Sequence, residues 1–137
     1  MIPELDYAFI AEHAQVADGK LNVMGASYTH LVVDALPTIH SIAVAGRIRA
    51  PKGAGPVEVA LIFSSPPGDS QYSIEGSIEL EQGPEVRPYG ENVGLLFAST
   101  LQALLPERGL YEVRVMVAGN EARRLAFSVE ILSSEDR

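Results

Sequence analysis

Apolar and polar residues alternate along most of this chain, and this alternation is the feature that most narrows its choice of fold. In SIAVAGRIRA, Ile42, Val44 and Ile48 fall on one face, and Arg47 and Arg49 fall on the other. The same period of two recurs in VEVALIF, YSIEGSIELE, YEVRVMV and LAFSVEI, with glycine, proline or asparagine between the runs. Because successive side chains of a strand point to opposite faces, this pattern is typical of β-strands with one buried face.

Two short turns indicate that neighbouring strands pair as antiparallel hairpins. VADGKL places Asp18 and Gly19 between two strand-like runs, which predicts a type I′ turn with positive φ at both residues. AGNEARR joins the last two runs, and we expect Gly119 and Asn120 to adopt positive φ there.

One segment fits two interpretations. The residues from Val93 to Leu101 alternate as a strand does, whereas Leu101, Leu104 and Leu105 have helical spacing that Pro106 would end. We favour a strand followed by a turn, so the sequence predicts at most one short helix or helical turn near residues 99–106.

The number and spacing of the runs predict the fold class. Seven or eight strands without a long helical pattern indicate an all-β protein, a single-domain antiparallel β-sandwich of the immunoglobulin-like or C2-like kind. A chain of 137 residues suffices for one such domain. We place the domain at residues 1–132 and expect SSEDR, residues 133–137, to be a frayed tail.

The composition argues against several classes of function. The chain has no cysteine, which excludes disulfide scaffolds, cysteine-ligated metals and thiol nucleophiles. Its net charge of −8 argues against nucleic acid as a partner, because phosphate binding requires a positive field. No apolar run reaches the roughly 18 residues of a membrane helix, and MIPELDY carries acids where a signal peptide would carry basic residues. We therefore expect a cytoplasmic protein that does not contact the membrane.

Part of the sequence resembles a known group of proteins. LDYAFIAEHAQVADGKLNVMGA, the ALP at residues 35–37 and AVAGRI resemble a family of short bacterial proteins of unknown function. GLYEVRVMVAGNEARRLAFSVEI is similar, in a general way, to the closing hairpin of immunoglobulin-like and C2-like sandwiches. The resemblance implies a bacterial all-β protein and brings no catalytic residue with it.

Candidate catalytic and metal-binding residues form no motif. The histidines, His13, His30 and His40, lack the spacing of metal ligands, and no serine lies in a GxSxG elbow. We therefore assign no catalytic, cofactor-binding or metal-binding residue and expect no cofactor. The alternative is a small enzyme, or a ligand-binding or metal-binding protein, with its site in the loops around His30, Asp34, His40 and Tyr89.

Two runs are apolar on both faces, which indicates a surface for association. Ile10 adds apolar character to the second face of the first run, and Leu96 does so in VGLLFASTL. A sandwich has one interior, so an apolar outer face needs a cover, either the loop from Glu81 to Asn92 or another chain. We predict a homodimer or larger closed oligomer that buries Ile10 or Leu96, or contact with an unidentified protein. The leading hypothesis is a non-catalytic protein-binding or assembly module. One subunit of a larger bacterial assembly is a further alternative.

Overall fold

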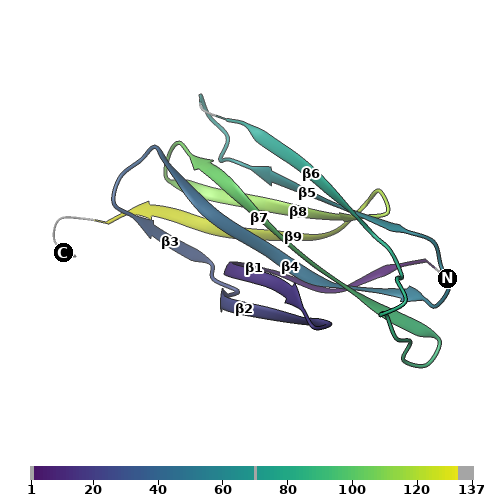
Figure 1. Cartoon of the computed structure of the whole chain (residues 1–137). Helices are drawn as coiled ribbons and strands as arrows, with labels where there is room; N and C mark the ends of the chain where they lie inside the picture. The colour runs from purple at the N-terminus through teal and green to yellow at the C-terminus, as the bar shows by residue number, and fades with distance from the viewer. Residues whose placement is uncertain (1, 70, 133–137) are drawn as a thin grey trace.

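In the part of the chain that the structure describes, the alternating runs form nine β-strands, which stack as two sheets (Figure 1). The computed structural model describes residues 2–69 and 71–132, so the expected tail at 133–137 lies outside the described residues. The strands are β1 (Glu4–Ala17), β2 (Lys20–Ala26), β3 (His30–Val33), β4 (Thr38–Pro51), β5 (Val57–Ser64), β6 (Ser73–Leu80), β7 (Asn92–Leu105), β8 (Gly109–Val117) and β9 (Asn120–Ile131). Within the described residues, no helix is long and apolar enough to cross a membrane.

The two sheets have the strand orders β2-β1-β4-β7 and β3-β9-β8-β5-β6, called here the four-stranded and the five-stranded sheet. Every pair is antiparallel except β3 with β9, which is parallel. The predicted all-β, mainly antiparallel sandwich is therefore confirmed.

The structure corrects the predicted strand count and the end of one strand. The described residues form nine strands instead of seven or eight, because His30–Val33, for which the sequence predicts no strand, pairs with β9. Four residues are too few for an alternating pattern to stand out. No helical turn forms at residues 99–106, since β7 continues to Leu105 and pairs with β4 along its whole length. That ladder satisfies backbone groups that a helical turn would have to satisfy locally.

Both predicted hairpins form, and one turn lies a residue earlier than expected. Asp18 and Gly19 have φ angles of 52° and 70°, which confirms the type I′ prediction. In the second hairpin Ala118 and Gly119 have the positive φ angles, 50° and 85°. Asn120 instead begins β9, and its side-chain amide donates a hydrogen bond to the carbonyl of Ala118 at 3.4 Å.

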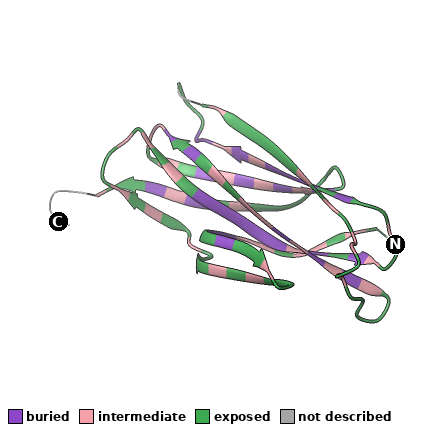
Figure 2. Cartoon of the chain, in the orientation of Figure 1, coloured by how far each residue is buried: buried purple, intermediate pink, exposed green. Residues whose placement is uncertain are grey.

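The core lies between the sheets, on strands whose residues alternate between buried and more exposed (Figure 2). It is rich in aromatic rings. Phe63, Tyr111 and Phe127 stack with ring centroids 5.7 to 6.4 Å apart. The Tyr111 hydroxyl donates to the carbonyl of Glu107 at 2.5 Å, so the one polar atom of this cluster is satisfied by backbone four residues upstream. A tyrosine that bonds back in this way is a feature of immunoglobulin-like sandwiches.

A second, smaller apolar cluster covers part of the outer face of the four-stranded sheet. Ala43 and Ala45 of β4 are fully buried, although they alternate with Val44, which points into the main core. Their cover includes Leu21 and Val23 of β2, so the β1–β2 hairpin folds over this face (Figure 1). The sequence predicted that the loop from Glu81 to Asn92 or another chain would cover the apolar outer face. On this part of the face, the β1–β2 hairpin of the same chain covers it instead.

Candidate functional site

The four residues of the alternative loop site do not lie together. His30 begins β3, and its Nε2 lies 3.3 Å from a carboxylate oxygen of Glu130 on β9. His40 lies near the start of β4, whereas Tyr89 bridges Asn92, which pairs with Pro51 at the far end of β4. Eleven residues of strand, about 36 Å, separate the two ends. Because of this separation, no single loop site contains both His40 and Tyr89. Asp34 directly follows β3.

The described side chains form no cluster of three candidate metal ligands. Within residues 2–69 and 71–132, no group of three histidine, aspartate or glutamate residues is placed to hold a metal ion. A cleft of about 570 Å³ lies between the β1–β2 turn, the start of β7 and the loop after β6. Its charged lining residues are Asp18, Glu81, Glu85 and Arg87, which include no nucleophile paired with a base.

The two predicted interface residues have different surroundings. Ile10 is 3% exposed and belongs to the core between the sheets, so its side chain is not on the surface of the chain. Leu96 is half-buried on the outer face of β7, opposite Arg47 of β4. Leu96 is therefore the one of the two that a partner could reach without opening the core.

The backbone of β7 faces β4 on one side, and no strand of the described residues lies on the other. Hydrogen bonds at the two ends of β7 show which of its N–H and C=O groups point away from β4. Asn92 exchanges two hydrogen bonds with Tyr89, of 2.8 and 3.2 Å, and the Tyr72 hydroxyl donates to the carbonyl of Leu104. Both partners lie away from β4, so the even-numbered residues of β7 direct their N–H and C=O groups to the open side.

Between these two closed ends, five residues form a free backbone edge. No backbone hydrogen bond from another described residue reaches this open side between positions 94 and 102. The residues are Gly94, Leu96, Ala98, Thr100 and Gln102, and we call them the β7 edge. Each offers one donor and one acceptor to whatever lies beside the sheet.

The β7 edge lacks the features that usually protect an edge strand from pairing. Its strand contains no charged residue and no proline, and it pairs with β4 without a register shift. The other edge strands are protected. β2 begins with Lys20, β3 has only four residues, and β6 carries Glu75 and Glu79.

Below the β7 edge, the inner face of β6 forms an uncovered apolar shelf. Ile74, Gly76 and Ile78 point to the same side as the buried residues of β5, with which they pair. β6 is nevertheless exposed along most of its length (Figure 2). A groove of about 170 Å³ lies between this shelf and Ser99 and Leu101 of β7. The shelf and the β7 edge thus border one groove.

A patch formed by Arg47, its partner Asp6 and Tyr7 lies beside the β7 edge on the outer face. The Arg47 Nε donates to Asp6 at 2.8 Å, and the guanidinium lies 5.4 Å from the centre of the Tyr7 ring. The hydrogen bond to Asp6 raises the pKa of Arg47. Arginine and tyrosine are frequent at the energetic centres of protein interfaces, so this patch could extend a contact that begins at Leu96.

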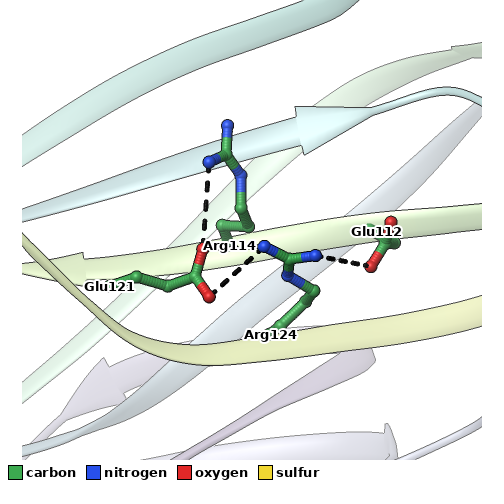
Figure 3. A network of polar contacts seen from close by, with 4 residues as sticks. All are labelled: Glu112, Arg114, Glu121 and Arg124. Atoms are coloured by element: carbon green, nitrogen blue, oxygen red, sulfur yellow. Dashed lines mark hydrogen bonds and ion pairs between the residues drawn. The ribbon is translucent and has the colours of Figure 1, made fainter.

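The outer face of the five-stranded sheet has a different character. Arg124 lies 3.1 Å from Glu121 and 3.7 Å from Glu112, and Arg114 lies 3.8 Å from Glu121 (Figure 3). All four side chains are more than a third exposed. Water and salt screen such exposed pairs, so they add little to stability and this network indicates a solvated face.

Sequence reasoning identified Leu96 and missed the edge beside it. The signal was present: fourteen residues, from Asn92 to Leu105, carry no charge and no proline. What the sequence does not state is that β7 ends a sheet, because that depends on the order in which distant strands pair.

Comparisons with known proteins give a family and a distant structural likeness. Residues 6–130 match the model of a family of unknown function, DUF6941. Among curated proteins, none matches the chain. A solved structure of the alkylpurine DNA glycosylase AlkC from Pseudomonas fluorescens, bound to DNA containing an abasic site analog, is similar over 90% of this chain and 30% of that one. The sequence identity is 11% and the TM-score is 0.42, so this likeness says nothing about function.

Proposed function

The chain belongs to the DUF6941 family of unknown function, and we propose that it is a non-catalytic protein-binding module that engages another polypeptide through the β7 edge. The observation that carries the proposal is the combination of a long free backbone edge with the absence of any protecting charge, proline or bulge. An extended polypeptide is the ligand whose own N–H and C=O groups match such an edge in spacing and direction.

Two further observations support the proposal. The half-buried Leu96 and the patch of Arg47 and Tyr7 adjoin the edge, which supplies side-chain contacts next to the backbone contacts. The separation of His40 from Tyr89 also favours the binding module over a loop site that contains both residues. We also propose the bacterial cytoplasm as the setting, supported by a sequence without cysteine. Fractionation of the native cells tests the setting, and recovery from a membrane or periplasmic fraction would contradict it.

Site-specific photo-cross-linking in the native cells tests the proposed function. A photoreactive amino acid replaces Thr100 at the β7 edge or, as a matched control, the exposed Arg123 on β9. We expect Thr100 to give one discrete cross-linked polypeptide that Arg123 does not give.

A second variant links that product to the backbone edge. Ala98→Pro removes only an N–H that faces the open side, a position at which an edge strand tolerates proline. We expect the Thr100 cross-link to disappear in this variant while the melting temperature stays within a few degrees of the parent. Identical cross-links from Thr100 and Arg123, or a Thr100 product that survives Ala98→Pro, would contradict the proposal.

A further inference from the structure

The four-stranded sheet has one strand fewer than the five-stranded sheet, and the unmatched strand, β6, lies next to the β7 edge. β5 is covered by β7, since the inward side chains of β5 are buried and the groove that Leu61 and Phe63 line is bordered by Ser99 and Leu101. No strand among residues 2–69 and 71–132 covers β6 in the same way, and its inward Ile74 is 46% exposed. The four-stranded sheet therefore has a vacant strand position next to β7 and above β6.

Gly76 gives this vacant position a specific shape. It lies in the middle of the shelf, between Ile74 and Ile78, and nothing lies within 4 Å of the place where its Cβ would stand. A glycine inside a strand leaves uncovered backbone that a large side chain from a neighbouring layer can cover. The shelf thus has a gap with an apolar residue on each side.

The ends of the vacancy define its length. The contact of Tyr72 with Leu104 closes one end, and the bridge of Tyr89 with Asn92 closes the other. The free positions run from Gly94 to Gln102, which are nine residues of strand or about 27 Å. A segment of this length would also border Glu85, Val86 and Arg87, which line the cleft beside Gly94 and Leu96.

The net charge of the chain favours a neutral or basic segment. Glu75 and Glu79 point to the outer face of β6, away from the shelf, and with the following Glu81 they form no ion pair with any residue in the described part of the chain. β6 has no basic residue to balance them, and the whole chain carries a net charge of −8. Basic side chains on an incoming segment would therefore be attracted by the net charge of the chain as a whole.

Resting on the proposed function, we infer that the β7 edge takes a single extended segment of another polypeptide. Its alternate residues are apolar and face the shelf, one large apolar side chain covers Gly76, and the residues between them are neutral or basic. The segment completes the four-stranded sheet as a fifth strand, hydrogen-bonded to the β7 edge.

A second copy of the chain fits this position poorly. In an antiparallel two-fold pair of β7 strands, the β7 of one copy would lie above the β6 of the other. Each β7 has its own β5 beneath it, so the β5 of one copy and the β6 of the other would need the same space. A free segment carries no second layer and meets no such obstacle.

Synthetic peptides test the inference. The probe is a nine-residue peptide, Val-Lys-Val-Lys-Phe-Lys-Val-Lys-Val, with its phenylalanine at the position expected to cover Gly76. Its controls are the same peptide with alanine for phenylalanine and a permuted peptide with its valines adjacent. We expect the probe to bind the full chain at least about tenfold more tightly than either control in fluorescence anisotropy at physiological salt.

Two variants of the chain locate the contact. Gly76→Leu fills the gap on the shelf, and Gly55→Leu places the same side chain in open space in a loop. We expect Gly76→Leu to weaken the probe about tenfold and to leave the alanine peptide unchanged, because the two changes remove the same contact. Gly55→Leu leaves both affinities unchanged.

The outcomes separate the two proposals. If Ala98→Pro abolishes peptide binding while Gly76→Leu has no effect, the β7 edge still binds strands and the inference about Gly76 is wrong. Equal affinity for the alternating and the permuted peptides overturns the inference as well. A dimer in light scattering that Ala98→Pro converts to a monomer would identify a second copy as the occupant and contradict the single-segment inference.

Discussion

Gly76 of β6 pairs directly with Leu61 of β5, yet Leu61 is only 7% exposed whereas Gly76 stands in open space. Both residues direct their Cα substituents to the interior side of the same sheet. The difference arises because the opposite sheet reaches over β5 and stops there. The interior of this sandwich thus continues onto the surface at one edge, next to a strand with free backbone groups.

Two glycines at matched positions in strands should respond in opposite ways to alanine. A Cβ at Gly46 of β4 would stand 2.3 Å from the carbonyl oxygen of Tyr7 and 2.9 Å from the Phe97 ring. We expect Gly46→Ala to lower the free energy of unfolding by about 3 kcal/mol, since neither backbone nor a packed ring can yield. Gly76→Ala meets nothing and should raise it by about 0.5 kcal/mol. Urea denaturation measures both, and equal effects would mean that β6 is covered.

The turn between β1 and β2 depends on backbone conformation alone. Gly19 has a φ of 70°, and nothing lies within 4 Å of its Cβ position. We expect Gly19→Val to destabilise the domain by about 1–2 kcal/mol, because a β-branched residue rarely adopts positive φ. Gly55→Val is the matched control, with equal space and no positive φ. An unchanged melting temperature for Gly19→Val would contradict the type I′ turn.

Tyr28 should make stability depend on alkaline pH. Burial and the nearby Glu12 raise the pKa of Tyr28 to about 12, from 10 in the unfolded chain. The folded state therefore holds the proton more tightly, and this contribution is complete below pH 10 and is lost as pH rises from 10 to 12. We expect the free energy of unfolding to fall less steeply over this interval in Tyr28→Phe than in the parent. The pKa values of Tyr72 and Tyr111 are also raised, so the free energy of unfolding still falls somewhat with pH in both the parent and the variant.

The same variant has a second expected result at neutral pH. The Tyr28 hydroxyl is buried and has no hydrogen-bond partner among the described residues. Removing an unsatisfied polar atom does not cost a hydrogen bond, so Tyr28→Phe should be neutral or stabilising by up to about 1 kcal/mol at pH 7. A clear loss of stability in thermal unfolding would show that the hydroxyl does have a partner.

The histidines should be dispensable for both metal content and fold. His30 faces Glu130, and His40 lies within the β4–β7 ladder, far from the bridge at Tyr89. We expect joint replacement of His13, His30 and His40 by glutamine to leave the metal content unchanged in native mass spectrometry. The circular dichroism spectrum should be unchanged too. Loss of a stoichiometric metal in the variant would contradict a non-catalytic binding module.

Much of the fold could be predicted because its signals are local. Alternation in SIAVAGRIRA needs only neighbouring residues, and the Asp18-Gly19 turn needs only two. The parallel strand at His30–Val33 could not be predicted, since its partner β9 lies about a hundred residues away and four residues carry little pattern. The position of Asn120 at the start of β9 was missed because asparagine also suits a turn.

The candidate site could be predicted only in part, for the same physical reason. The two apolar faces of VGLLFASTL indicated that Leu96 requires a covering contact, and Leu96 does lie on the β7 edge. Ile10 gave the same signal but lies in the core, because the β1–β2 hairpin and the opposite sheet cover both faces of β1. A sequence pattern shows that a face is apolar. Which strand ends a sheet is decided by pairing between distant segments.

Residue-resolved amide hydrogen exchange of the dilute chain tests the central claim most directly, because it distinguishes the two sides of one strand. The amides of Leu96, Ala98 and Thr100 face the open side of β7, whereas those of Leu95, Phe97 and Ser99 face β4. The account predicts fast exchange for the first set, slow exchange for the second, and protection of the first set when the alternating peptide binds. Equal protection of both sets in the free chain would contradict it, because the β7 edge would then already be covered.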